Sequence, residues 1–247
     1  MRLSFATFIG NRSVLGASAM TKPPRTHGFL VRAFLAGTCA AVCILSVMAF
    51  GREYVAATLL RGTGPETVLA MRVFDPRLVA GSVRSMDDLM KTCADLLVNT
   101  EMVRVSSQLQ HDIGETCGTA ARAILARNPG FARAYAAGLI AARADVTPAA
   151  YAQAAAAAPF EPWPLAMRLL SAERAMANGT LPADLTAPVS ADMTHAVQSI
   201  SGRDLLAGLY QRQTGLRDLI QTAVRSRPDA EQRGFVNALR ALAAADG

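Results

Sequence analysis

Residues 124–139 read ILARNPGFARAYAAGL, and this stretch shows how the chain is built. A run compatible with a helix ends at Asn128-Pro129, because Pro lacks the N–H of a helix interior and disfavours a helical conformation in the preceding residue. A second, Ala-rich run with helical character begins directly afterwards. The stretch predicts two helices joined by a short turn, and short turns favour antiparallel neighbours.

The same arrangement recurs twice further along the chain. Residues 154–170 (AAAAAPFEPWPLAMRLL) break at Pro159, and residues 223–239 (AVRSRPDAEQRGFVNAL) break at Pro228. The first interval between the Pro residues is 30 residues, and the second is 69, about two units of 34 or 35. Periods of this size are typical of stacked helical hairpins.

These units resemble tetratricopeptide-type repeats, in which a small residue packs between two helices and a Pro follows the second helix. Each of the three units has a residue at the matching position, five before its Pro: Ile124, Ala154 and Ala223. Tyr135 is similar to the early aromatic residue of that family, and Gly138 lies one residue before the family's Gly. The resemblance covers roughly 116–245 without a complete motif, and the unit around residues 180–200 is degenerate. It implies a solenoid of helical hairpins.

The chain from Arg52 onward is expected to be all-α, as a content of 48 Ala residues also favours. Ser85 and Thr147 are predicted helix N-caps, the latter followed by Pro at the first helical position. Asn178-Gly179 is a predicted helix end. Helices are expected at about 65–74, 85–100, 112–127, 131–144, 148–158, 163–178, 190–200, 203–213, 215–227 and 229–245. The expected fold class is a solenoid or bundle of helical hairpins.

Residues 33–50 form an apolar segment, AFLAGTCAAVCILSVMAF, with no charge in 18 residues. At about 1.5 Å per residue, a helix of this length nearly spans a hydrocarbon core about 30 Å thick. The segment therefore predicts a single transmembrane helix in contact with lipid. A cleaved signal peptide is the alternative, but its apolar core usually has only about 7–15 residues, so the longer run favours an uncleaved anchor.

The charge distribution predicts how this helix is oriented. Six of the 25 Lys and Arg residues lie within residues 1–52, which contain no acidic residue, and the remaining chain has 19 basic and 19 acidic residues. Positive charge before the helix predicts a cytoplasmic N-terminus and an exported C-terminal domain, which is periplasmic in a bacterium. Because the exported part is formally neutral, the net charge of +6 does not indicate nucleic-acid binding.

The expected domain organisation follows from these features. Ala33, Gly37 and Ala41 form a stripe of small residues that is a candidate for association between two such helices. Met20 is an alternative start, which would leave residues 1–19 untranslated. The expected segments are a basic cytoplasmic tail, the transmembrane helix, a juxtamembrane linker with one helix, and an exported helical repeat-like domain, at 1–32, 33–50, 51–84 and 85–247.

The four cysteines divide between the membrane and the exported domain. Cys39 and Cys43 lie in the apolar segment and are interpreted as apolar filler. Cys93 and Cys117 are the two cysteines of the exported domain. An even number in an oxidising compartment favours one disulfide between them, and two buried free thiols are the alternative.

The sequence contains no recognisable catalytic or ligand-binding motif. His27, His111 and His195 lack the spacing of a zinc site. Neither a G-x-S-x-G nucleophile motif nor a Gly-rich phosphate or dinucleotide loop occurs. We therefore expect no enzyme activity, no metal and no cofactor.

The segment Pro159-Phe-Glu-Pro-Trp-Pro164 gathers the single Trp of the chain, a Phe and three Pro. Phe160 and Trp163 are candidate contacts for a protein partner, because Trp is enriched at interaction hot spots. The favoured interpretation is a turn between helices, with Trp163 packed back onto the domain.

Helical solenoids act by binding, so the expected function is a membrane-anchored adaptor or scaffold for protein partners. The resemblance to tetratricopeptide-type envelope proteins implies roles such as polysaccharide export, secretion or complex assembly. A periplasmic enzyme or small-ligand-binding helical protein without a recognisable motif is the alternative.

Overall fold

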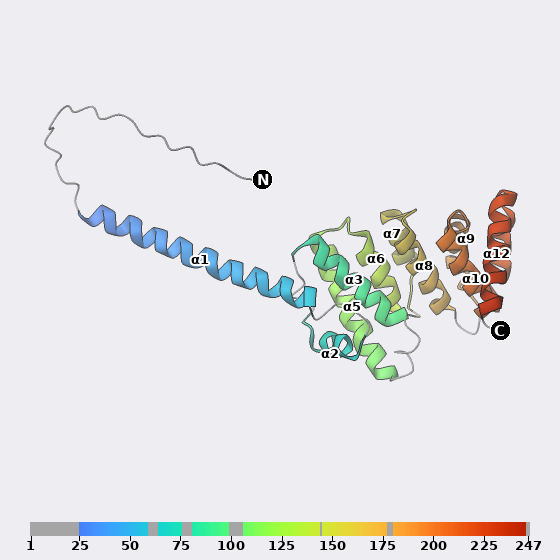
Figure 1. Cartoon of the computed structure of the whole chain (residues 1–247), viewed down its shortest axis with the longest axis horizontal. Helices are drawn as coiled ribbons and strands as arrows, with labels where there is room; N and C mark the ends of the chain where they lie inside the picture. The colour runs from blue at the N-terminus through green and yellow to red at the C-terminus, as the bar shows by residue number, and fades with distance from the viewer. Residues whose placement is uncertain are drawn as a thin grey trace, which may run out of the picture. The chain divides into compact units, whose positions relative to one another are not determined.

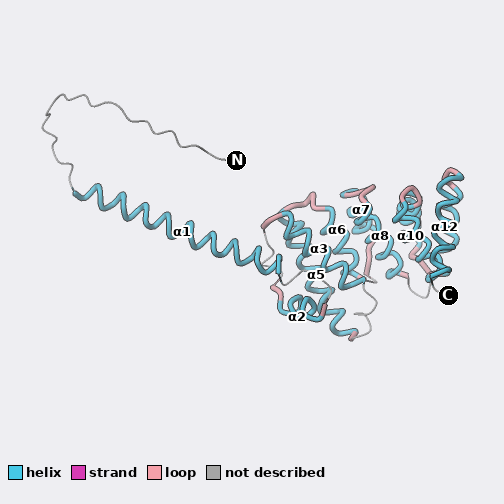
Figure 2. The backbone as a smooth tube through the Cα atoms, in the orientation of Figure 1, coloured by secondary structure: helices cyan, strands magenta, loops and turns pink. Residues whose placement is uncertain are grey.

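The computed structural model of the chain forms helices throughout the parts that it describes. These parts are residues 25–58, 64–75, 81–98, 106–143, 145–176 and 180–245. Figure 2 shows helices joined by loops and no strand within these residues. The all-α class predicted from the sequence is therefore confirmed. The chain divides into two compact units, Met1–Ser46 and Val47–Gly247, which are described separately.

Helix α1 (Arg25–Thr58) contains the candidate membrane span. Its apolar run Leu30–Gly51 has 22 residues, all exposed, and includes the predicted segment 33–50. At about 1.5 Å per residue it is long enough to cross a bilayer, and its composition is apolar enough to do so.

The second unit consists of helices that pack mainly against the next helix along the chain and the one after it. Figure 1 shows this succession, with α5 beside α6, α6 beside α8 and α10 beside α12. The helices are α2 (Pro65–Val73), α3 (Val83–Val98), α5 (Ser107–Arg127), α6 (Ala132–Ala142), α7 (Pro148–Ala157), α8 (Pro162–Ala175), α9 (Ala183–Ala196), α10 (Ile200–Arg212), α11 (Arg217–Arg225) and α12 (Asp229–Ala245). A short 3-10 helix, Thr214–Leu216, precedes α11.

The three Pro breaks lie where the sequence predicts turns between helices. Pro129 separates α5 from α6, Pro159 separates α7 from α8, and Pro228 separates α11 from α12. The matched residues five positions earlier are all buried: Ile124, Ala154 and Ala223. Residues 124–139 therefore form the predicted helix, turn and helix.

Several predicted helix ends differ from the structure. Thr147 caps α7 as predicted, since its side chain accepts a hydrogen bond from the N–H of Ala150 at 3.2 Å. Ser85 does not cap α3, because the helix begins two residues earlier and the Ser82 hydroxyl accepts from the Ser85 N–H at 3.1 Å. Asn178-Gly179 lies outside the described residues, and α8 ends at Ala175.

Helices α5 and α9 begin well before their predicted starts at 112 and 190. Helix α5 starts at Ser107, because the Ser106 side chain caps it by accepting from the N–H of Leu109. Helix α9 starts at Ala183 and includes Pro188, although the prediction begins at 190. Pro188 lies in the second turn and does not end the helix, because the helix continues to Ala196.

Helix α1 extends beyond the candidate membrane span into the segment 51–84, for which the sequence predicts a juxtamembrane linker and one helix. Helix α1 continues to Thr58, and the sequence has no Gly or Pro from 52 to 58 that would end it. On this extension, Glu53 accepts hydrogen bonds from the Ser82 N–H at 2.8 Å, the Ser82 hydroxyl at 2.7 Å and the Ser85 hydroxyl. The bond from Ser85, followed by those from Ser82, lowers the pKa of Glu53 and keeps the carboxylate charged.

The core of the second unit has two parts. Buried side chains of α2, α3, α5 and α6 form the first part, and those of α7 to α12 form most of the second. Helix α8 contributes to both, because Met167 packs in the first part and Leu169 in the second. Ala134, Ala136 and Ala137 on α6 are fully buried, so the Ala-rich composition serves close packing between helices.

The turn between α9 and α10 depends on a close approach at Gly202. A Cβ on this residue would overlap the carbonyl oxygen of Ala196 and lie 2.8 Å from its carbonyl carbon. Because these atoms belong to the backbone, they cannot rotate away. We expect Gly202→Ala to lower the free energy of unfolding by about 1–3 kcal/mol, the usual cost of overpacking. Urea unfolding of the full chain in detergent, followed by Trp163 fluorescence, measures this change.

Gly138→Ala is the matched control for this substitution. A Cβ at Gly138 would lie 3.7 Å from the Cβ of Ala121, which is an ordinary contact. Ala also favours a helix interior over Gly. We expect no loss of stability in the control, and equal losses in the two variants would contradict the argument from Gly202.

Candidate partner-binding site

Phe160 lies in the turn between α7 and α8 and remains at the surface. Its side chain is 68% exposed, although its ring contacts His195 edge to face with the ring centroids 4.9 Å apart. His195 lies in the last turn of α9, so this contact joins the turn to the end of that helix. Within the described residues, the His195 Nδ1 is buried without a hydrogen-bond partner.

Trp163 is placed differently from Phe160, although the sequence groups the two. It is half-buried in the first turn of α8 and packs against the core formed by α3, α5 and α6. The Arg133 guanidinium lies over the Trp163 ring, 5.5 Å from its centroid, and forms an ion pair of 2.6 Å with Asp87. The packed-back interpretation therefore describes Trp163, whereas Phe160 is available at the surface.

An apolar cleft of about 270 Å³ has Trp163 in its wall. The wall also includes Pro162, which directly follows the turn that contains Phe160, and Ala196, which follows His195. Its walls come from the start of α8, the end of α9 and the start of α10. Ile200 lies in sequence between Ser199 and Ser201 of the cleft wall, and its side chain is 74% exposed. The wall residues are Pro162, Trp163, Leu165, Ala166, Ala196, Ser199, Ser201, Gly202 and Leu205. The cleft and the exposed Phe160 together form the candidate site.

A buried ionic network holds the helices beside this site. Arg168 of α8 is fully buried and donates from Nε and Nη2 to the Asp192 carboxylate of α9, at 2.7 and 2.9 Å. The Tyr151 hydroxyl of α7 donates to the same carboxylate at 2.7 Å. Burial, followed by the charge of Asp192, raises the pKa of Tyr151, so its hydroxyl stays protonated and continues to donate. The network therefore links α7, α8 and α9.

The same arginine also fixes the turn that presents Phe160. Arg168 Nη1 donates to the carbonyl of Ala158 at 2.8 Å, and Nη2 lies 3.3 Å from the carbonyl of Pro159. These carbonyls follow the end of α7 and have no partner within that helix. Sequence reasoning missed Arg168, yet its place three residues after Leu165 and four before Ala172 is a core position of a helix.

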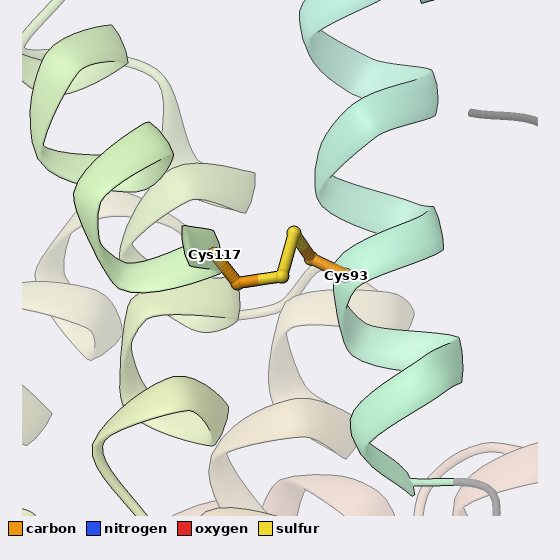
Figure 3. Close-up of a disulfide and its surroundings, with 2 residues drawn as sticks. All are labelled: Cys93 and Cys117. Atoms are coloured by element: carbon orange, nitrogen blue, oxygen red, sulfur yellow. A yellow bond between two sulfur atoms is a disulfide. The ribbon is translucent and has the colours of Figure 1, made fainter. Parts of the chain in front are cut away.

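The structure brings together the two cysteines of the helical domain. Figure 3 shows Cys93 of α3 joined to Cys117 of α5 by a disulfide. The S–S distance is 2.17 Å and the Cα–Cα distance is 5.6 Å. Both residues are fully buried between their helices. Cys39 and Cys43 are free and exposed on α1.

The predicted association stripe lies on the apolar run of α1. Ala33, Gly37 and Ala41 are all exposed, and a Cβ at Gly37 would meet no atom within 4 Å. The stripe is therefore open to a second helix, and helix association through it stays a prediction.

No protein-family model, curated protein or solved structure matches this chain. The resemblance to tetratricopeptide-type repeats therefore stays an interpretation of the sequence motifs.

Proposed function

We propose that the chain is a membrane-anchored adaptor or scaffold whose helical domain binds a protein partner in a cell-envelope process. Helix α1 is the anchor, because its run Leu30–Gly51 is long and apolar enough to span a bilayer. The N-terminus is cytoplasmic and the helical domain lies on the exported side, the periplasm in a bacterium. The excess of Lys and Arg before the span supports this orientation.

The disulfide supports the same orientation. Disulfides persist in oxidising compartments and are rare in the cytosol of most organisms. The Cys93–Cys117 bond joins α3 and α5, which belong to the part of the chain after the span. An exported domain provides the environment in which such a bond forms and lasts.

The architecture that we propose for this domain is a solenoid of tetratricopeptide-like hairpins. Packing of each helix mainly against the next helix and the one after supports it, as do the three Pro turns. Hairpin solenoids expose extended surfaces that bind proteins.

The exposure of the Phe160 side chain is the main support for the proposed binding function. Its large ring is exposed and contacts His195, the neighbour in sequence of the cleft residue Ala196, and aromatic residues often anchor protein interfaces. The buried bonds from Arg168 to Ala158 and Pro159 hold the turn in place. A rigid anchor loses little conformational entropy when it binds, which favours its use at an interface.

A site-specific cross-linking experiment tests this proposal. A photoreactive amino acid replaces Phe160 in the full chain in native membranes, and a second variant carries it at Leu69 of α2. Leu69 is a matched control because it is also apolar and 63% exposed. We expect position 160 to give a discrete cross-linked protein, identified by mass spectrometry, that position 69 does not give.

A second variant asks whether the aromatic ring is needed. Phe160→Asp is expected to abolish co-purification of the cross-linked protein, because a charge would lose hydration at an apolar interface. Unfolding of this variant should match the wild type, since the residue is exposed. The same products from positions 160 and 69, or undiminished co-purification by Phe160→Asp, would exclude this surface as the binding site.

A further inference from the structure

A larger cleft of about 680 Å³ lies between α5 and α6, bordered by Leu97 of α3 and Arg174 of α8. Its volume is in the range of about 300–1,000 Å³ that is usual for small-molecule sites. Gly114 of α5 is part of the wall, and a Cβ there would lie 3.4 Å from the carbonyl oxygen of Ala141. The cleft does not include Phe160 or the wall of the apolar cleft.

Three arginines from different segments of the chain line this cleft: Arg122, Arg143 and Arg174. Their hydrogen-bond partners are neutral. Arg122 donates to the Thr119 hydroxyl at 2.9 Å, and Arg143 donates to the Gln110 side chain at 3.1 Å. Arg174 donates to the carbonyls of Leu97 and, at 3.4 Å, Ile140. Within the described residues, none of the three forms an ion pair.

The electrostatics of Arg174 reflect its burial beside another positive charge. Burial, followed by the positive charge of Arg143, lowers the pKa of Arg174, and the nearby Glu173 only partly offsets these effects. A bound anion would favour the charged form of the Arg174 guanidinium. Planar guanidinium groups match the paired oxygens of carboxylate and phosphate groups.

The backbone of Arg143 is an independent observation. This residue follows the end of α6 with φ 57° and ψ −115°, and it is the one non-glycine residue with positive φ in the described parts of the chain. Glycine adopts such a conformation without steric cost, whereas a residue with a Cβ is strained. Strained residues cluster at functional sites, so an arginine here points to a role for its side chain.

We propose that this cleft binds a small hydroxylated oxyanion, with Arg122, Arg143 and Arg174 holding its carboxylate or phosphate group. Glu115 and Asp145 line the same cleft and can accept hydrogen bonds from the hydroxyl groups of the ligand. A uronic acid and a sugar phosphate share this chemistry. The site goes beyond the proposed adaptor function and does not depend on it.

Calorimetric titration of the full chain in detergent micelles tests the proposal. The probes are glucuronate, glucose 1-phosphate and, as a neutral control, glucose. We expect saturable binding of at least one of the two anions, weakened by added NaCl, and no binding of glucose. The better anion identifies the source of the oxyanionic group.

The variant Arg143→Gly tests whether the Arg143 side chain binds the anion or only stabilises the fold. Its thermal unfolding midpoint should equal or exceed that of the wild type, because the backbone strain is relieved. Its affinity for the anion should be at least about tenfold lower, since a charge-assisted hydrogen bond is lost. Arg122→Gln should also weaken binding, whereas Arg225→Gln on α11, which is remote in sequence and does not line the cleft, should not.

The proposal is overturned if neither anion binds saturably, if glucose binds as well as the anions, or if Arg143→Gly binds like the wild type. A lower unfolding midpoint in Arg143→Gly would contradict the argument from strain. Arg122→Gln then decides whether the arginines bind the anion, and wild-type affinity in that variant would overturn the site.

Discussion

Replacing Asp192 with Asn is expected to lower the free energy of unfolding by about 3–5 kcal/mol, the usual cost of breaking a buried ion pair. Arg168 would stay fully buried and lose the charge that its Nε and Nη2 bind. The Tyr151 hydroxyl would lose its ionised acceptor in the same change. Urea unfolding of the full chain in detergent, followed by Trp163 fluorescence and circular dichroism, measures the effect.

A graded series of variants separates the terms of this network. Tyr151→Phe removes one neutral donor and should cost about 1–1.5 kcal/mol. The double variant Arg168→Met/Asp192→Leu should be closer to the wild type than either single change, because no uncompensated charge remains. Glu231→Gln breaks the ion pair with Arg227 at the surface and should leave the unfolding midpoint nearly unchanged. Strictly additive losses in the double variant would show that the two residues do not interact.

Replacing Cys93 and Cys117 together with Ala is expected to lower the free energy of unfolding by about 3 kcal/mol. The bond closes a loop between positions 24 apart in sequence, so its loss enlarges the unfolded ensemble. Treatment of the wild type with a reductant should produce a similar loss. The same urea unfolding measurement applies.

The two free cysteines on α1 provide the control. Cys39→Ser/Cys43→Ser should leave the stability of the helical domain unchanged, because these residues lie outside it. Alkylation of denatured wild-type chain should modify two thiols without reductant and four after reduction, as counted by mass spectrometry. Four reactive thiols before reduction would show that the disulfide does not form in cells.

Local sequence signals predicted the helical class and many of the turns. Pro129, Pro159 and Pro228 lack the backbone N–H that a helix interior needs, and this property does not depend on the rest of the fold. The apolar run 33–50 is likewise visible because length and composition alone decide whether a helix can cross a bilayer. The pairing of Cys93 with Cys117 could be inferred by counting, since they are the two cysteines after the apolar run.

Contacts between helices could not be predicted in the same way. Arg168 and Asp192 are separated by 24 residues, and no local pattern identifies one as the partner of the other. The larger cleft is lined by Arg122, Arg143 and Arg174, which lie on three different segments. The hydrogen bonds from Ser82 to Glu53 likewise join residues that are distant in sequence, and no local pattern predicts them. These features depend on how the helices pack, which a single sequence does not specify.

The buried pair also constrains how the protein can evolve. A mutation of Arg168 or Asp192 alone would lower the free energy of unfolding by about 3–5 kcal/mol, which is a large part of the stability of most domains. Replacement of the pair should therefore require two nearly simultaneous mutations, or earlier mutations that add stability elsewhere. The disulfide between α3 and α5 is one source of such additional stability. Lineages that lost it would have the least freedom to change residues 168 and 192.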